Sequence, residues 1–289
     1  QAAAAAGQGL LMQRYGEAFA RCGGKVGQVL LTHADLSNRI RANNARAALT
    51  KLLDLGVVPI INENDAVAVD EIRFGDNDEL AAMVAPLCAA DLLLLLSNVD
   101  GLLDGSERVP FVATIDGGAE RLVTGARSTV GRGGMHSKLQ AAKHATLAGA
   151  HVVIAAAHTE GIVERVLAGD DVGTLFPAVR QRLSMRKHWI AYTLRPRGVA
   201  IVDPGAAGAI CRDGRSVLYV GVIGVRGDFV SGDPISIRTS DGREIARGLA
   251  QHSAGEAARL AQSDDALLVH RDDLVVLPPV PGDAVPGDD

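Results

Sequence analysis

Apolar runs and amphipathic segments alternate along the first half of this 289-residue chain. Short apolar runs, which predict buried strands, occur at 27–32, 57–61, 91–97 and 151–155. Segments with apolar residues at helical spacing lie at 1–20, 41–55, 78–90 and 135–148. Because buried strands that alternate with helices form parallel sheets covered on both faces, this pattern predicts an α/β fold, a mostly parallel sheet sandwiched by helices.

The pattern changes after residue 192. Short strand-like runs now lie between Gly and Asp turns, at 199–202, 217–220, 234–238 and 244–249. Such spacing is typical of a small β-barrel. We therefore predict a first domain over 1–192, a β-barrel-like second domain over 193–277, and a disordered tail, rich in Pro, Gly and Asp, over 278–289.

Composition narrows the class of protein. The 29 basic and 34 acidic residues give a net charge of -5, which argues against a surface built for nucleic acid, and aromatic residues make up only 3% of the chain. The three cysteines, Cys22, Cys88 and Cys211, form no CxxC pair, so neither a disulfide framework nor a zinc site is indicated. No apolar run is long enough to span a bilayer. These features predict a cytoplasmic protein without a membrane anchor.

Two loops rich in amides and acids are the first candidate chemistry. Asn62-Glu63-Asn64-Asp65 follows the apolar strand at 57–61, and Gly75-Asp76-Asn77-Asp78 comes shortly after it. In α/β sheets, ligands bind at such strand ends. Amides donate and accept hydrogen bonds while carboxylates only accept, so the set suits an amino acid with its ammonium and carboxylate groups. The alternative is that each loop is an ordinary turn.

A glycine-rich turn is the second candidate. Gly131-Arg132-Gly133-Gly134 leads into Met135-His136-Ser137-Lys138 at the start of a predicted helix. Exposed backbone N–H groups at a helix N-terminus can face a polyphosphate, and Lys138 follows in the first turns. Phosphoryl transfer builds negative charge that an ammonium group stabilises. The turn therefore predicts a phosphate site.

These motifs occur together with Ser97-Asn98-Val99-Asp100-Gly101, and their order resembles that of the glutamate 5-kinases in the amino-acid kinase family. The second domain resembles the PUA domain that bacterial members carry, through Val202-Asp203-Pro204-Gly205-Ala206, Gly227-Asp228-Phe229 and Gly232-Asp233. The resemblance implies ATP-dependent phosphorylation of the γ-carboxylate of L-glutamate to L-glutamyl 5-phosphate, the first step of proline biosynthesis. It also implies Mg²⁺, feedback inhibition by proline, and a homo-oligomer.

The resemblance assigns roles to individual residues. It implies that Asp65 and Asn77 hold glutamate, that Asn62 shapes this pocket, and that Asp78 orients catalytic lysines, of which Lys138 is one. Asp78 could instead serve only the dipole of the helix that follows. Nucleotide contacts are implied for Ser97, Asn98, Arg132, Gly133, Gly134, Met135, His136, Ser137 and Lys138. Asn98 stands where the family has an acid, and Arg132 where it has a threonine.

Other residues receive no such role. Glu63 and Asp76 are expected to be solvated loop charges, and the eight histidines show no metal-ligand spacing. The acceptor carboxylate is already ionised at neutral pH, so no histidine base is needed. Seven arginines of the second domain are interleaved with aspartates, which indicates an ordinary solvated surface rather than an RNA site.

Members of the family begin with a strand that carries a characteristic lysine, followed by a Thr-Ser-Gly-Ala loop. This sequence contains no counterpart of either feature. Either the sequence is a piece of a longer kinase, which we expect because losing a central strand exposes apolar surface, or the protein is shortened and has lost part of its machinery. As written, such a chain is expected to be a poor enzyme. Three alternatives stay open: another amino-acid kinase, an RNA-binding protein, or a regulatory protein acting through the PUA domain.

Overall fold

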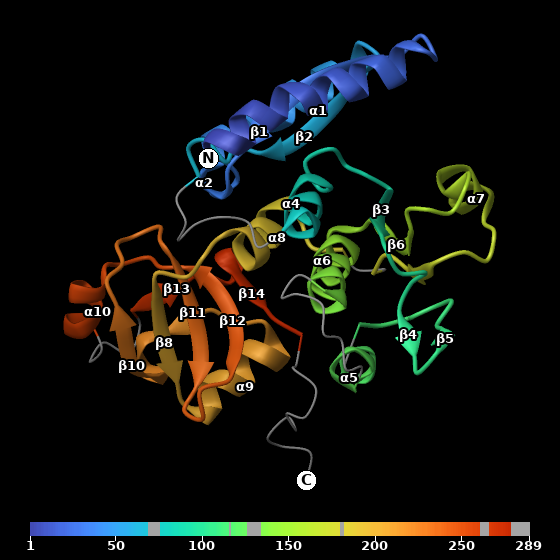
Figure 1. The fold of residues 1–289 in the computed structure, drawn as a ribbon. Coiled ribbons are helices and arrows are strands. Elements are labelled where there is room, and N and C mark those ends of the chain that lie inside the picture. The colour runs from blue at the N-terminus through green and yellow to red at the C-terminus, as the bar shows by residue number, and fades with distance from the viewer. Residues whose placement is uncertain (69–75, 116, 126–133, 180–181, 261–265, 279–289) are drawn as a thin grey trace. The chain divides into compact units, whose positions relative to one another are not determined.

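The computed structural model describes residues 1–68, 76–115, 117–125, 134–179, 182–260 and 266–278 (Figure 1). The chain divides into two compact units, Gln1–Arg182 and Leu183–Asp289. The predicted boundary near Tyr192 stays a prediction, and the predicted disordered tail falls outside the described residues except for Pro278.

The first unit is built from helices and short strands in alternation. In chain order its elements are α1 (Ala2–Ala20), β1 (Lys25–Leu31), α2 (His33–Ser37), α3 (Arg39–Asp54), β2 (Val57–Glu63), α4 (Asn77–Val84), β3 (Leu92–Ser97), β4 (Leu103–Asp104), β5 (Glu107–Arg108), α5 (Gly117–Gly125), α6 (Met135–Ala148), β6 (His151–Ala156), α7 (Ile162–Ala168) and β7 (Thr174–Phe176). The α/β class predicted from the apolar pattern is confirmed.

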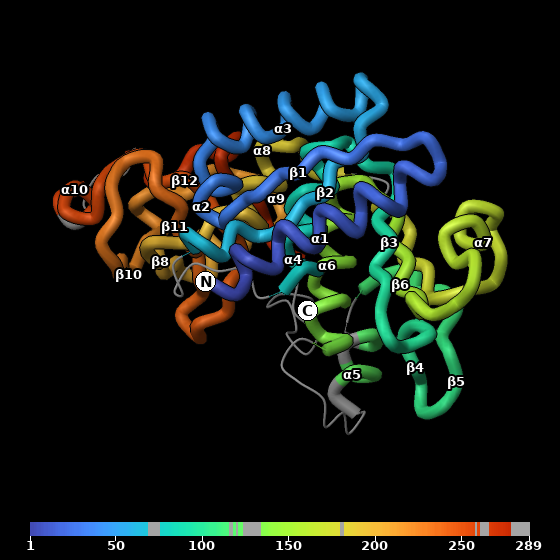
Figure 2. Tube along the Cα trace, turned by 45° about the horizontal axis from the view of Figure 1, so that its top comes forward, coloured from blue at the N-terminus to red at the C-terminus, as the bar shows by residue number. Residues whose placement is uncertain are grey.

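Strands β1 and β2 form a parallel pair, in register from Lys25 opposite Val57 to Leu31 opposite Glu63. Figure 2 shows α1 and α3 on either side of this pair. Gly27 lies under α3, where a Cβ atom would come within 3.1 Å of the Leu52 side chain, so the small residue permits the close approach of helix and strand. Because the strands are parallel, both of their carboxyl ends face the same edge of the sheet.

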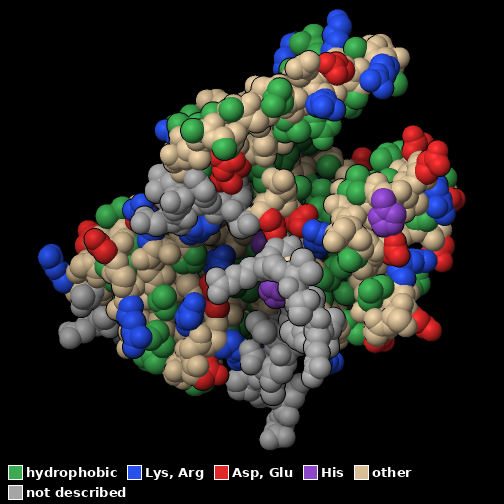
Figure 3. All heavy atoms as spheres, viewed as in Figure 1, with side chains coloured by type: hydrophobic (Ala, Val, Ile, Leu, Met, Phe, Trp, Pro, Cys, Tyr) green, Lys and Arg blue, Asp and Glu red, His purple; other side chains and the backbone are tan. Residues whose placement is uncertain are grey.

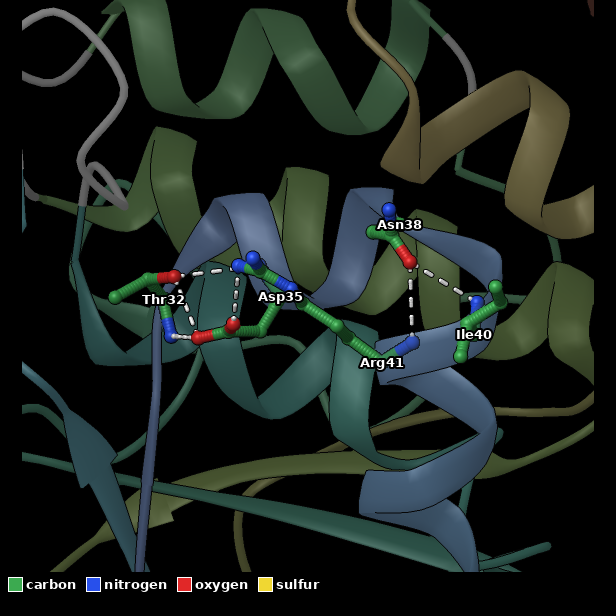
Figure 4. A network of polar contacts seen from close by, with 5 residues as sticks. All are labelled: Thr32, Asp35, Asn38, Ile40 and Arg41. Atoms are coloured by element: carbon green, nitrogen blue, oxygen red, sulfur yellow. Dashed lines mark hydrogen bonds and ion pairs between the residues drawn. The ribbon is translucent and has the colours of Figure 1, made fainter.

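Capping contacts fix the chain where it leaves β1 (Figure 4). The Thr32 hydroxyl accepts a hydrogen bond from the Asp35 amide at 3.2 Å, and the Asp35 carboxylate accepts from the Thr32 amide at 2.9 Å. Asn38 caps α3 by accepting from the amides of Ile40 and Arg41, both at 3.1 Å. Burial alone would raise the pKa of Asp35, but the Thr32 hydrogen bonds and Arg41 hold it below the ordinary value. These bonds pin the carboxyl end of β1 beside that of β2.

The second sheet of this unit has the order β3-β6-β7. β3 and β6 are parallel, from Leu92 opposite His151 to Ser97 opposite Ala156, while β7 is antiparallel to β6. The described strands of this unit form three sheets, β1-β2, β3-β6-β7 and the short hairpin β4-β5. The longer strands pair in parallel as predicted, while β7 and the hairpin add antiparallel pairs. The chain enters β7 through Gly173, which has a positive φ of 70°, and antiparallel strands beside parallel ones are common in α/β proteins.

Helix α4 contributes to the cores of both sheets. Its Leu80, Met83 and Val84 pack with residues of β1, α2 and α3, whereas Ala82 packs in the core around Leu139 of α6. Figure 1 shows α4 beside α6, and the two helices are in contact. The predicted helix 78–90 ends at Val84, two residues before Pro86, which has no N–H group to donate to the Ala82 carbonyl. Packing on two sides fixes the start of α4, where the second acidic loop ends.

The second unit contains a mixed sheet of order β10-β8-β11-β12-β14 and a smaller pair, β13-β9. Its elements are α8 (Met185–His188), a π-helix (Trp189–Thr193), β8 (Gly198–Val202), α9 (Pro204–Asp213), β9 (Val217–Leu218), a 3₁₀-helix (Tyr219–Gly221), β10 (Val222–Gly227), β11 (Pro234–Thr239), β12 (Glu244–Leu249), α10 (Ala254–Leu260), β13 (Leu267–Val269), a 3₁₀-helix (Arg271–Asp273) and β14 (Leu274–Val276).

The strand-rich character of this unit is as predicted, with two differences. The strand expected at 217–220 ends at Leu218, where a 3₁₀-helix begins. The helix α9 is not indicated by apolar periodicity, because its sequence contains two glycines. Asp203 caps it by accepting from the Ala206 amide at 2.8 Å, and Pro204 occupies its first turn.

Candidate functional site

The N-termini of α4 and α6 meet through an ion pair. Lys138 Nζ lies 2.7 Å from Asp78 Oδ2, and only 14% and 15% of the two side chains are exposed. Both residues stand in the first turns of their helices, 60 positions apart in sequence. A partly buried pair is less screened than a surface pair, so the carboxylate holds the flexible ammonium in one place.

A second contact runs beside the first. The Ser137 hydroxyl donates a hydrogen bond to the Asp76 carboxylate, which also accepts from the Glu79 amide at 3.0 Å as the N-cap of α4. The expectation that Asp76 is a solvated loop charge is therefore wrong. An acid three residues before Glu79, at the start of an apolar helix, is a capping signal that the sequence already contained.

The cap gives a testable stability effect. Asp76→Ala should lower the free energy of unfolding by about 1 kcal/mol, because the Glu79 amide loses its capping acceptor. Asp76→Asn, which keeps a capping oxygen, should cost less, and Ser137→Ala should leave the cap intact. Urea denaturation of the three variants measures this, and equal losses for Asp76→Ala and Asp76→Asn would contradict the capping role.

Helix α6 starts after its N-cap, Gly134, and no side chain among the described residues caps it. His136 is exposed, but the Met135 side chain packs into the core around Leu139, so Met135 could contact a nucleotide only through its backbone. Predicted contacts Arg132 and Gly133 fall outside the described residues.

The first acidic loop lies at the carboxyl end of β2. Asn62 donates to the Gln8 side chain at 3.0 Å and accepts from the Glu63 amide at 3.0 Å. Both ends of this amide are thus engaged inside the protein, which suits a residue that shapes the loop rather than one that grips a ligand. Asp65 follows in a turn and is partly exposed.

The remaining predicted residues lie on two elements. Asn77 is the first residue of α4 and is exposed. Ser97 ends β3, and its hydroxyl donates to the side-chain oxygen of Asn98 at 3.3 Å. The structure thus joins Asp76 and Asp78 directly to the start of α6. In the described part of the chain, no hydrogen bond joins Asp65, Asn77 or Ser97 to that pair, so their grouping around a substrate stays a prediction.

Neither metal ligands nor an activated thiol accompany this site. Among the described residues, no group of three or more His, Cys, Asp and Glu side chains is arranged to hold a metal ion. All three cysteines are free, and burial raises the pKa of the Cys88 and Cys211 thiols, with Arg243 partly opposing this at Cys211. Raised thiol pKa values disfavour the nucleophilic thiolate.

Known proteins share this organisation. A sequence profile described as the amino acid kinase family matches residues 1–156. The chain belongs to the amino acid kinase family. A second profile, the PUA domain, matches residues 198–270, so this kinase-family chain also carries a PUA domain.

Curated relatives resemble the chain over almost its whole length. It is 46% identical to the glutamate 5-kinase of Geobacter metallireducens over 296 aligned residues, which cover 96% of this chain and 79% of the relative. The glutamate 5-kinase of Moorella thermoacetica is 47% identical, with 96% and 78% covered, and that of Trichlorobacter lovleyi 45%, with 96% and 79% covered. Amino acid kinases take their phosphoryl group from ATP, so the Lys138–Asp78 pair is the natural candidate for the phosphate side of the site.

Among the described residues of the PUA domain, several basic side chains pair with acidic ones. Arg197 lies 3.7 Å from Asp233, and Arg247 lies 2.8 Å from Glu244. Figure 3 shows basic and acidic side chains interspersed on the face in view. A cavity of about 440 Å³ between α9 and the β11–β12 hairpin contains no residue of the predicted kinase site. These observations favour an ordinary solvated surface over a continuous phosphate-binding groove.

None of the helices that the structure describes combines the length and the apolar character needed to cross a bilayer.

Proposed function

We propose that this protein transfers the γ-phosphoryl group of ATP to the γ-carboxylate of L-glutamate, giving L-glutamyl 5-phosphate and ADP in the first step of proline biosynthesis. The observation that carries the proposal is the Lys138–Asp78 ion pair, which links the acidic loop before α4 to the glycine-rich turn before α6. The likeness to glutamate 5-kinases over 96% of the chain supports glutamate as the acceptor.

The residues divide into an acceptor side and a donor side. Asp65 would accept hydrogen bonds from the α-ammonium group of glutamate, Asn77 would bind its polar groups, and Asn62 would hold the loop in shape. On the donor side, Ser97 and Asn98 would contact the nucleotide. The backbone amides at the start of α6, together with Arg132 and Ser137, would face its phosphates.

The reaction needs no proton acceptor. An oxygen of the ionised γ-carboxylate attacks the γ-phosphorus in line, a new O–P bond forms, and the bond to the bridging oxygen of ADP breaks. Lys138 stabilises the charge that grows on the transferring phosphoryl group, and Asp78 keeps the ammonium aimed at it.

Magnesium fits this scheme as part of the nucleotide. The described residues offer no carboxylate cage, and Mg²⁺ is commonly held by substrate phosphates with few protein ligands. When bound there, it neutralises phosphate charge. The backbone amides of the glycine-rich turn, together with Lys138, would then bind the phosphate oxygens that Mg²⁺ does not contact.

We further propose that proline competes for the glutamate pocket, that the protein forms homo-oligomers, and that it works in the cytoplasm, a reducing compartment that suits three free thiols. RNA binding by the PUA domain is not favoured, because Arg197, Arg247 and Arg271 form ion pairs with acidic residues. A regulatory or oligomer-shaping role is the proposal for this domain.

The test is formation of an acyl phosphate. The protein is incubated with ATP, Mg²⁺ and one candidate acceptor, and the product is trapped with hydroxylamine. We expect hydroxamate with L-glutamate, and little with aspartate, N-acetylglutamate or carbamate. A folded protein that makes no hydroxamate, or prefers another acceptor, would contradict the proposal.

A further inference from the structure

A single buried hydroxyl group holds the segment that follows β3. Thr174, the first residue of β7, is fully buried. Its hydroxyl accepts a hydrogen bond from the Leu102 amide at 2.8 Å and donates one to the Val109 carbonyl at 2.6 Å. The hydroxyl group therefore both donates to and accepts from the backbone of a segment that lies 65 to 72 positions earlier in the chain.

The two groups held by Thr174 form the base of the β4–β5 hairpin. The Val109 amide donates to the Leu102 carbonyl at 2.8 Å, so the two residues pair directly. Leu102 is 1% exposed and packs in the core around Leu139. One hydroxyl thus secures both strands of the hairpin at the point where they leave the core.

Two glycines make this contact close. Gly101 has a φ of 149°, and a Cβ atom there would lie 2.5 Å from the Thr174 hydroxyl oxygen. Gly173 has a φ of 70°, and its Cβ atom would lie 2.5 Å from the Ile154 carbonyl oxygen in β6. Neither position has room for a side chain, so the turn after β3 and the start of β7 are both fixed against the sheet.

Arg108 adds a second connection at the surface. Its guanidinium group donates to the Gly173 carbonyl and lies 2.6 Å from the Asp171 carboxylate. The Arg108 side chain is 24% exposed, and Asp171 is 76% exposed. The hairpin is therefore tied to the β7 side by one buried hydroxyl group and one partly exposed arginine.

We propose that Thr174 is a positioning residue for the nucleotide side of the kinase reaction, an inference that rests on the proposed function. Ser97 and Asn98 lie three to five residues before Gly101 and Leu102 in the same turn. Because Thr174 fixes the end of this turn, it holds Ser97 and Asn98 where they can contact the nucleotide. Among the described residues, the Thr174 hydroxyl bonds to Leu102 and Val109 and not to the acceptor loops at β2 and α4, so we expect glutamate binding not to depend on it.

The test compares the Michaelis constants of variants with those of the parent protein. Thr174→Val keeps the shape and removes both hydrogen bonds, and we expect it to raise the KM for ATP about tenfold while the KM for glutamate changes less than about twofold. Thr174→Ser keeps the hydroxyl group and should restore the KM for ATP. Arg108→Met, which leaves the core untouched, should give a smaller rise in the same constant.

Thr146→Val is the matched control. Thr146 is also buried, but its hydroxyl donates only to the Lys143 carbonyl within α6, at 3.1 Å. We expect this variant to lose stability without a change in either Michaelis constant. Thermal unfolding of all variants identifies any that fail to fold. If Thr174→Val fails to fold, the Michaelis constants of Thr174→Ser and Arg108→Met test the positioning role instead.

Equal changes in the two Michaelis constants, or an unchanged KM for ATP in folded Thr174→Val, would overturn the positioning role. Titration with ADP by calorimetry separates this result from a failure of the proposed function. If the parent protein phosphorylates no glutamate but binds ADP, weaker ADP binding by Thr174→Val still supports the inference, and equal binding overturns it.

Discussion

Replacing Lys138 by alanine should lower kcat by about a thousandfold, with the KM for glutamate changed by less than about threefold. Lys138 stands at the start of α6, and its ammonium group lies 2.7 Å from Asp78. The proposed mechanism puts the transferring phosphoryl group at this end of α6. Its interaction strengthens as charge develops in the transition state, so its loss reduces turnover more than binding of the acceptor. Steady-state kinetics with hydroxamate trapping measures both constants.

Lys143→Ala is the control for this prediction, because Lys143 lies on the same helix but five residues beyond Lys138. It should retain near-normal turnover. Lys138→Arg keeps the positive charge in a different geometry and should recover part of the activity. If Lys138→Ala turned over at a normal rate, Lys138 could not stabilise the transferring phosphoryl group.

Replacing Asp65 by alanine should raise the KM for glutamate about a hundredfold, with little change in the KM for ATP. The reason is the loss of charge-assisted hydrogen bonds to the α-ammonium group, each of which is stronger than a bond between neutral groups. Asp65 stands in the turn after β2 and is partly exposed, so its removal leaves the buried core intact. Kinetics with each substrate varied in turn provides the measurement.

Asp65→Asn refines this second prediction. It keeps the size of the side chain and an acceptor oxygen but removes the charge, so its KM for glutamate should lie between those of the parent and Asp65→Ala. An unchanged KM for glutamate in Asp65→Ala would reject the assignment. A rise confined to the KM for ATP would place Asp65 on the nucleotide side instead.

Much of the fold follows from local patterns. The apolar runs at 57–61 and 91–97 predict β2 and β3 to within two residues, although most residues of both strands are only half-buried and Val58 and Leu96 are exposed. Local signals also account for two features that the apolar pattern did not predict, the end of α4 and the start of α9. Pro86 lies two residues after the end of α4, and Asp203 with Pro204 starts α9, although the glycines of α9 hide its apolar face.

The arrangement of strands depends on contacts that no local pattern contains. β7 runs antiparallel to β6, and Gly173 at its start lies so close to the Ile154 carbonyl that a Cβ atom would clash with it. The pairs β1-β2 and β3-β6-β7 form separate sheets, and α4 shares its apolar side chains between the cores beside them. Such choices are set by tertiary packing, which overrides local preference.

In the candidate site too, some contacts follow from the sequence and others depend on tertiary packing. Motif order in the sequence suggested that Asp78 orients Lys138, and the structure puts the two in an ion pair, although their catalytic role stays a prediction. The link from Ser137 to Asp76 and the clamp at Thr174 were not anticipated. Each joins residues more than 60 positions apart through a single hydroxyl group, and a serine or threonine carries no sequence signal of its distant partner.

The central claim is that Lys138, held by Asp78, faces the phosphoryl group that passes to glutamate. A crystal structure of the protein bound to L-glutamate and a non-hydrolysable ATP analogue tests it most directly. We predict that Lys138 Nζ lies within hydrogen-bonding distance of a γ-phosphate oxygen while it still contacts Asp78, with the glutamate γ-carboxylate in line. A nucleotide bound away from the start of α6, or a Lys138 side chain directed away from its phosphates, would contradict the claim.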